Sequence, residues 1–312
     1  MAGHAVLVSG TRARFSSGFA AEIIEGRSKL EQLGGQELTL PFSKGEIDAM
    51  YFDLPRVPRK AVIFFPGMGE AYERIGVYEY SEECLVYQYL QAGFCVLLWN
   101  YPHVSRSTGS PTIDQVMESA DVVLRYLTDT QDIQEHRILL HGHSMGGGLS
   151  VHFATQRIKE TGELRYPKLN ICNDRSYSHL SNALTTLAGK VQIIGPPSGW
   201  LASMILSKLC RWELDTLSNW NLPESQGFYW LIHHINDEMV PHHASLAFAL
   251  QEASREVKVI ELDTNNSCVR GRTTVNYEEI YDDVCHERPL TPLEWEQHLV
   301  ILSEVFPDVI HV

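Results

Sequence analysis

Residues 136–154 read HRILLHGHSMGGGLSVHFA, and this stretch fixes the centre of the expected fold. The apolar run 138–140 comes first, glycines follow it, and apolar residues then return. An apolar run, a glycine cluster and a second apolar segment favour a strand, a sharp turn and a helix in that order. Gly142, Ser144 and Gly146 have the G-x-S-x-G spacing of a nucleophile elbow.

The spacing has a chemical reason. A serine on a strained strand-to-helix turn exposes its hydroxyl, and flanking glycines let strand and helix approach without a Cβ clash. The N–H of Met145, at the positive end of the new helix, is expected to face a developing oxyanion. The alternative is a glycine-rich turn without chemistry, but the strand before and the helix after favour Ser144 as a nucleophile.

This stretch resembles the elbow of the α/β-hydrolase superfamily, in which GHSMGG is a frequent form. The resemblance runs roughly from Glu37 to the C-terminus, and it is closest to small intracellular proteins of this type with a short lid. It implies an α/β fold with a mostly parallel central sheet, flanking helices and a short helical lid or cap. The expected division is an N-terminal extension 1–35 and a hydrolase domain 36–312, with the lid insertion at about 185–225.

Composition limits the number of domains and the classes of partner that are expected. The chain has 312 residues, of which 44% are hydrophobic, enough for one α/β domain with a sizeable core. The 25 basic and 39 acidic residues give a net charge of −14, which argues against nucleic acid as a partner. The six cysteines are scattered without a C-x-x-C pair, so reduced structural thiols are expected.

No secretory signal is visible, because the apolar run 5–8 is too short, and no apolar run has the length of a membrane span. A cytoplasmic location is therefore expected, with unconventional export left open. The insertion 191–222 contains the apolar segment 200–209, which is a lid, a core helix or an interfacial helix. Peripheral membrane contact has little support there, because Lys208 and Arg211 are the few basic residues nearby.

Apolar periodicity and turn residues predict the remaining elements. Strands are expected at 37–42, 47–54, 60–65, 94–99, 138–140, 169–172, 228–232 and 257–262, and helices at 20–33, 80–92, 114–128, 240–253 and 291–306.

The loop 66–70, PGMGE, follows a buried strand. In the resembled family the corresponding strand ends in an HG-x loop that gives the second oxyanion N–H. The resemblance implies that Met68 supplies this donor, with Pro66 in place of the usual His. An ordinary strand-to-helix turn is the alternative.

The loop 100–112, NYPHVSRSTGSPT, resembles the family's D-Y-x-G-x-G-x-S-x-G-x-P loop. Two glycines of that pattern are replaced by His103 and Ser105, and the leading Asp is replaced by Asn100. We assign this loop no catalytic role.

The segment 233–241, HHINDEMVP, looks like the family's H-G-x-x-D-x-x-V-P, with His234 in place of Gly. Asp237 falls on the position of the triad acid, just past a strand's carboxyl end, where a carboxylate that orients a histidine belongs. The alternatives are that Asp237 caps the helix 240–253 and that Glu238 is the acid.

The family places its catalytic histidine between the last strand and the closing helix. His286 is the only histidine in that interval and precedes the helix 291–306, which Thr291 is expected to cap. His298 lies inside this helix and is the rival base.

Ser144, Asp237 and His286 follow the chain order nucleophile, acid and base. The expected mechanism is an acyl-enzyme on Ser144, with His286 as base, Asp237 fixing its tautomer, and the N–H groups of Met68 and Met145 holding the oxyanion. No cofactor is expected. The substrate class is a small-molecule or lipid acyl ester or thioester, and transfer of the acyl group to an alcohol or thiol is a variant of the same chemistry.

Two other hypotheses stay open. The first is a hydrolase-like scaffold that binds a protein or lipid partner without turnover, favoured by Pro66, the lost glycines after Asn100 and the displaced histidine loop. The second is a metal site among the 14 histidines. The pairs 233–234, 242–243 and His141 with His143 form neither H-E-x-x-H nor a Cys/His finger, so no metal is expected and these histidines are interpreted as structural or surface residues.

Overall fold

The structure is a computed structural model that describes residues 17–78, 84–183, 212, 214–263, 285–286 and 288–310. Three predicted features lie outside these ranges: the first part of the N-terminal extension, the apolar segment 200–209 with most of the proposed lid, and the polar segment 264–284 before His286.

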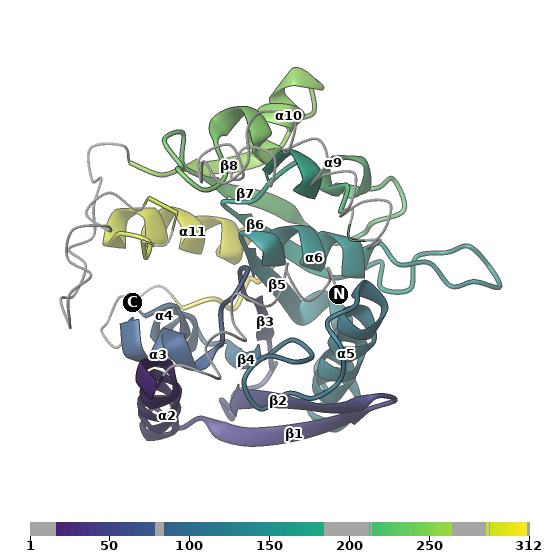
Figure 1. Cartoon of the computed structure of the whole chain (residues 1–312). Coiled ribbons are helices and arrows are strands. Elements are labelled where there is room, and N and C mark those ends of the chain that lie inside the picture. The colour runs from purple at the N-terminus through teal and green to yellow at the C-terminus, as the bar shows by residue number, and fades with distance from the viewer. Residues whose placement is uncertain are drawn as a thin grey trace, which may run out of the picture.

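A sheet of eight strands runs through the described residues in the order β1-β2-β4-β3-β5-β6-β7-β8 (Figure 1). The pairs β1–β2 and β2–β4 are antiparallel, and the others are parallel. The strands are β1 (Gln36–Phe42), β2 (Gly45–Phe52), β3 (Ala61–Phe65), β4 (Cys95–Trp99), β5 (Ile138–His143), β6 (Asn170–Asp174), β7 (Tyr229–His233) and β8 (Lys258–Glu261).

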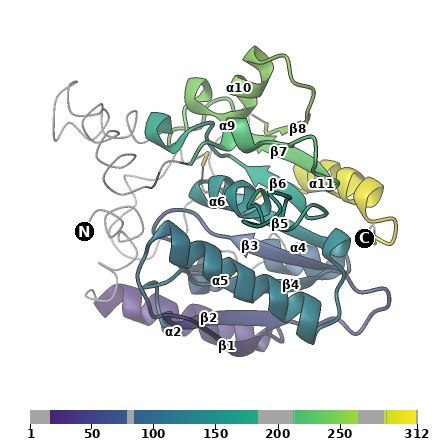
Figure 2. The ribbon, with the colours of Figure 1, turned by 90° about the vertical axis from the view of Figure 1, so that its right-hand side faces the viewer.

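Helices cover both faces of the sheet (Figures 1 and 2). One face carries α2 (Ser17–Gln32), α3 (Glu73–Tyr78), α4 (Leu85–Gln91) and α11 (Pro292–Val305). The opposite face carries α5 (Ile113–Arg125), α6 (Met145–Ala154), α9 (Thr216–Asn219) and α10 (Leu246–Glu252). Short turns of other helical types occur at Tyr126–Thr130, Glu135–Arg137 and His242–Ala244.

The central strand β3 shows why its sequence is apolar throughout. Ala61, Ile63 and Phe65 belong to the core under α5 and α6, whereas Val62 and Phe64 belong to the core under α4 and α11. A strand that is covered on both faces buries every side chain, so its sequence does not alternate. The predicted α/β fold, with a mostly parallel sheet flanked by helices, is confirmed.

Several element boundaries differ from the prediction by a few residues, and two of the differences have a clear structural cause. β5 continues three residues past the apolar run 138–140, because His141 and His143 stay paired with β6 and are buried. The helix expected to start at 240 begins at Leu246, because the hydroxyl of Ser245 accepts the Phe248 N–H and caps the helix there.

Helix α2 is tied to the sheet by a buried charge. The Arg27 guanidinium lies 2.6 Å from a carboxylate oxygen of Asp48 on β2 and 2.6 Å from one of Glu73 on α3. A buried cation requires such partners, so this part of the predicted extension packs as an integral layer. The domain boundary at residue 35 stays a prediction.

No helix within the described ranges combines the length and the apolar character that a bilayer crossing requires.

The contact between β3 and α6 predicts that Gly146→Ala severely destabilises the fold. A Cβ at Gly146 would lie 1.9 Å from the carbonyl oxygen of Phe65, a backbone atom that cannot rotate away. We expect a loss of about 3 kcal/mol or more in the free energy of unfolding, measured by urea denaturation.

The matched control is Ser150→Ala, on the same helix. It removes a buried hydroxyl that donates to the Gly147 carbonyl and adds no atom. We expect a change of about 1 kcal/mol or less. Equal stability of Gly146→Ala and the wild type would contradict the tight strand–helix contact.

Candidate active site

Ser144 occupies a strained turn between β5 and α6. Its backbone has φ 53° and ψ −119°, a positive φ that a residue with a Cβ rarely adopts. Its N–H donates to the Asp174 carbonyl at 2.9 Å, which ties the turn to the end of β6. The hydroxyl-bearing residue is partly exposed between two rigid elements, as a nucleophile requires.

Asp237 and His286 form a buried pair. His286 Nδ1 lies 2.7 Å from Asp237 Oδ2, and both side chains are almost fully buried. The other oxygen, Oδ1, accepts the N–H groups of Met239 and Val240 at 2.8 and 2.7 Å. Asp237 therefore also caps a turn, but the cap of α10 is Ser245.

The protonation of this pair follows from its surroundings. Burial raises the pKa of Asp237, but His286 and the Val240 N–H outweigh burial and leave the pKa below its ordinary value. An ionised carboxylate can only accept, so His286 Nδ1 donates in this hydrogen bond. In the neutral form of the ring, Nε2 then presents a lone pair. This tautomer is the one that a general base needs.

The loop after β3 provides backbone donors. The Tyr101 hydroxyl donates to the Pro66 carbonyl at 2.9 Å, and Glu70 Oε2 accepts the Gly67 N–H at 2.6 Å. No acceptor among the described residues receives the Met68 N–H, and Met145 starts α6, so its N–H has no intrahelical acceptor. Met68 and Met145 as oxyanion donors stay a prediction that this geometry supports.

His143 has a larger role than the sequence indicates. Its Nε2 donates to the His286 carbonyl at 2.9 Å, and the two rings lie 4.8 Å apart. Its Nδ1 lies 3.6 Å from Glu70 Oε1. Burial lowers the pKa of His143, but the Glu70 carboxylate outweighs burial and raises the pKa to about 9. Burial likewise raises the pKa of Glu70, whereas His143 brings it down to about 2.

In the loop 100–112, two residues that replace glycines of the resembled pattern have the positive φ that glycine favours. His103 and Ser105 stand where the resembled pattern has glycines, and both have positive φ, 74° and 47°. Asn100 is buried, and its NH₂ group donates to Asp48 and Glu73, both at 3.0 Å. An aspartate there would face two carboxylates without a donor, which explains the asparagine.

A mainly apolar pocket adjoins the serine. Its lining residues are Met68, Ser144, Met145, Tyr177, Leu180, Ala183, Met239 and Val240. Such a lining suits an acyl chain better than a charged group.

His298, the rival base, belongs to a different cluster. It is fully buried on α11, its Nε2 lies 2.9 Å from the Tyr89 hydroxyl, and its Nδ1 accepts the Trp230 N–H at 3.3 Å. Burial holds the pKa of His298 well below its ordinary value. The histidine paired with Asp237 is therefore His286.

In the described part of the chain, one group of three side chains has the types and the closeness of metal ligands: His141, Cys172 and His298. The Tyr89 hydroxyl lies 2.7 Å from His141 Nδ1 and 2.9 Å from His298 Nε2. These ring nitrogens thus already have a hydrogen-bond partner, so we interpret the group as a buried hydrogen-bond network.

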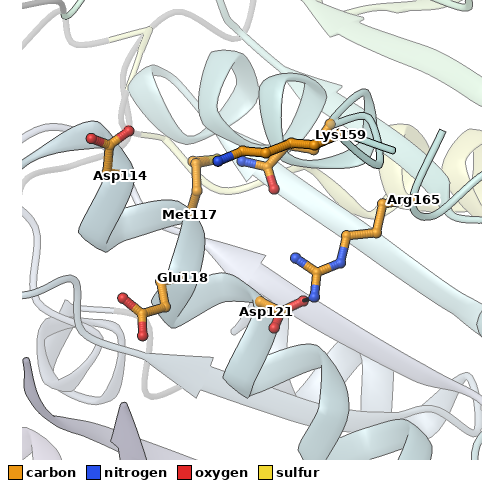
Figure 3. A pocket seen from close by; sticks show the side chains of 7 residues that line it. Asp114, Met117, Glu118, Asp121, Lys159 and Arg165 are labelled. Carbon is orange, nitrogen blue, oxygen red and sulfur yellow. Dashed lines mark ion pairs between the residues drawn. The ribbon is translucent and has the colours of Figure 1, made fainter. Parts of the chain in front are cut away.

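A second hollow lies between α5 and the segment 156–165 (Figure 3). Asp121 on α5 points toward Arg165 and pairs with it at 3.0 Å. Glu118 accepts the N–H and the hydroxyl of Ser43, both at 2.9 Å. Both carboxylates already have partners, and neither residue lines the pocket beside Ser144.

A mostly parallel sheet with helices on both faces and a strand–turn–helix at Ser144 is the architecture of the α/β-hydrolase fold, and this chain has that fold. The fold is similar to that of an α/β hydrolase from Vibrio vulnificus, with a TM-score of 0.54 and 20% identity over 74% of this chain and 75% of that one. It is also similar to the Pyrococcus furiosus esterase Pf2001, with a TM-score of 0.55 and 16% identity over 75% and 84%.

Residues 35–221 match the family described as Chlamydia CHLPS protein (DUF818), and the chain belongs to this family. The phosphatidylserine lipase ABHD16A of Mus musculus is 27% identical over 225 residues, which are 70% of this chain and 35% of that protein. The chain thus spans about a third of the length of the curated relatives that it matches first.

The pair of Glu70 and His143 predicts a pH-dependent stability. Because the pKa of His143 is raised from 6.5 to about 9 and the pKa of Glu70 is lowered from 4.5 to about 2, the pair stabilises the fold fully between about pH 4.5 and 6.5. This contribution disappears as the pH rises through about 9 or falls through about 2. In Glu70→Gln the His143 imidazole should titrate at a lower pH than in the wild type. The greater stability of the wild type over Glu70→Gln should vanish above about pH 9. Imidazole NMR titration and urea unfolding across this range measure both effects.

Glu135→Gln is the control, because Glu135 accepts a backbone N–H of Lys168 away from the site. It should leave the His143 titration unchanged. A wild-type His143 that titrates at its ordinary value would refute the assigned pairing.

Proposed function

We propose that this protein is a serine hydrolase that cleaves a carboxylic ester or thioester through Ser144, His286 and Asp237. The observation that carries the proposal is the 2.7 Å hydrogen bond between His286 Nδ1 and Asp237 Oδ2. His286 is joined by its carbonyl to His143, the neighbour of Ser144 in the strained elbow. The acid, the base and the nucleophile thereby belong to one edge of the sheet.

The proposed reaction has two halves. Ser144 Oγ attacks the acyl carbonyl carbon while His286 Nε2 takes its proton, and the N–H groups of Met68 and Met145 hold the oxyanion. The bond to the leaving group then breaks, and His286 returns the proton to the departing alcohol or thiol. Water attacks the acyl-enzyme with His286 again as base, releasing the acid and restoring Ser144.

An apolar acyl group is the preferred part of the substrate. The pocket beside Ser144 is lined mainly by methionine and aliphatic side chains, and a relative carries the name phosphatidylserine lipase. Leu180 and Ala183 of this lining directly precede the proposed lid insertion, 185–225. We therefore propose a lipid or other acyl ester as substrate, with the insertion as lid and residues 36–312 as one hydrolase domain.

The scaffold hypothesis has lost part of its support. The loop 100–112 retains the backbone that glycines would adopt, and Pro66 is held through its carbonyl by Tyr101. Neither departure from the family pattern removes a group that the proposed reaction uses.

Fluorophosphonate labelling tests the proposed reaction. The wild type should label, Ser144→Ala should not, and Ser150→Ala should label like the wild type. Asp237→Asn should lower the labelling rate by about 10²- to 10⁴-fold, because the amide favours the wrong tautomer of His286. A folded wild type that neither labels nor hydrolyses any ester would overturn the proposal.

The pocket predicts a preference for acyl length. Ala183→Phe fills part of the lining, so it should lower kcat/KM for an octanoyl ester by about 10-fold or more relative to an acetyl ester. A p-nitrophenyl ester series measures the ratio, and the acetyl ester serves as internal control. An unchanged ratio would place the acyl chain elsewhere.

A further inference from the structure

We propose that Glu238, Arg175 and His143 form a clamp on the backbone of the turn that carries His286, and that Glu238 is its principal positioning residue. The inference rests on the proposed function, because the turn matters only if His286 is the base. It concerns the described residues Cys285, His286 and Arg288, which lie outside regular helix and sheet.

Glu238 binds two consecutive backbone donors with one carboxylate. Its Oε2 accepts the Cys285 N–H at 3.0 Å, and its Oε1 accepts the His286 N–H at 3.2 Å. Hydrogen bonds from a backbone N–H to an ionised carboxylate are stronger than those between neutral groups. With both oxygens engaged by the backbone, Glu238 orients the turn, whereas Asp237 pairs with the ring.

Arg175 and His143 hold the carbonyls of the same turn. Arg175 Nη1 donates to the Cys285 carbonyl at 3.2 Å and to the Arg288 carbonyl at 2.6 Å. His143 Nε2 donates to the His286 carbonyl between them at 2.9 Å. The backbone groups of the turn thus obtain from side chains the partners that a ladder would otherwise supply.

The three clamp residues come from neighbouring strand ends. His143 ends β5, Arg175 follows β6, and Glu238 lies in the loop after β7. The side chains that hold the turn therefore come from the carboxyl ends of the same strands that Ser144 and Asp237 follow.

The clamp supplies what the Asp237–His286 bond cannot supply alone. That bond fixes one ring nitrogen, but it does not fix the backbone from which the ring projects. A displacement of about 1 Å in a reacting group can cost about 100-fold in rate. A carboxylate that fixes two adjacent N–H groups therefore restricts the base without touching the substrate.

The test compares Glu238→Gln and Glu238→Ala with the wild type in ester hydrolysis. We expect kcat to fall about 10- to 100-fold in Glu238→Ala and less in Glu238→Gln, which keeps one acceptor oxygen, with KM within about twofold of the wild type. Glu135→Gln is the control, because Glu135 is also a carboxylate that accepts a backbone N–H. This variant should retain wild-type kcat.

A spectroscopic reading separates positioning from general stability. The proton on His286 Nδ1, assigned by NMR through its loss in His286→Gln, should shift or broaden in Glu238→Gln and stay unchanged in Glu135→Gln. A wild-type proton signal together with wild-type kcat in Glu238→Gln would overturn the clamp, as would a loss that appears in KM alone.

The clamp and the proposed function fail differently. If Ser144→Ala hydrolyses esters as well as the wild type, the proposed function is wrong. If hydrolysis depends on Ser144 but folded Glu238→Ala keeps kcat within twofold, the function stands and the clamp is wrong. Should Glu238→Ala fail to fold, the nearly isosteric Glu238→Gln decides the question by kcat and by the proton signal.

Discussion

The buried ion pair of Asp174 and Arg175 is the interaction on which the arrangement of the candidate site depends. The Arg175 guanidinium binds both carboxylate oxygens of Asp174, at 2.7 and 2.8 Å, and extends from there to the carbonyls of Cys285 and Arg288. The Asp174 carbonyl accepts the Ser144 N–H. Two adjacent residues, Asp174 at the end of β6 and Arg175 directly after it, thus connect the elbow with the turn of the base. Burial raises the pKa of Asp174, but Arg175 outweighs burial and keeps it well below its ordinary value, so the pair stays charged.

A chain of hydrogen bonds runs through the core from Trp230 to Asp174, with every donor in it pointing toward Asp174. This chain defines the role of His298. The Trp230 N–H donates to His298 Nδ1, so a neutral His298 carries its proton on Nε2 and donates to Tyr89. The Tyr89 hydroxyl then donates to His141 Nδ1, which leaves the His141 Nε2 proton facing Asp174 Oδ2 at 3.5 Å. Burial lowers the pKa of both histidines, in agreement with neutral rings. His298 therefore supports the site from the core.

Much of the fold could be predicted because its determinants are local. Apolar runs such as 60–65 mark buried strands, and the spacing around Ser144 marks the elbow. The contacts of Glu238 with His286 and of His143 with Glu70 join residues 48 and 73 positions apart (286 − 238 and 143 − 70), and no periodicity encodes them. The same limit explains why Glu238 resembled a rival acid: its sequence position places it beside Asp237, whereas its two oxygens face the turn.

The three proposed catalytic residues are positioned by different physical means. Ser144 and Asp237 follow strands whose register is fixed by ladders that include Phe65 with Gly142, so the core that stabilises the sheet also places them. His286 lies in a turn without a ladder of its own in the described residues, so its backbone groups are bound by side chains. Sheet register is maintained by many interactions and tolerates the loss of any one, whereas the turn depends on a few side-chain hydrogen bonds. Changes in those side chains should therefore alter the proposed catalysis before they alter the fold.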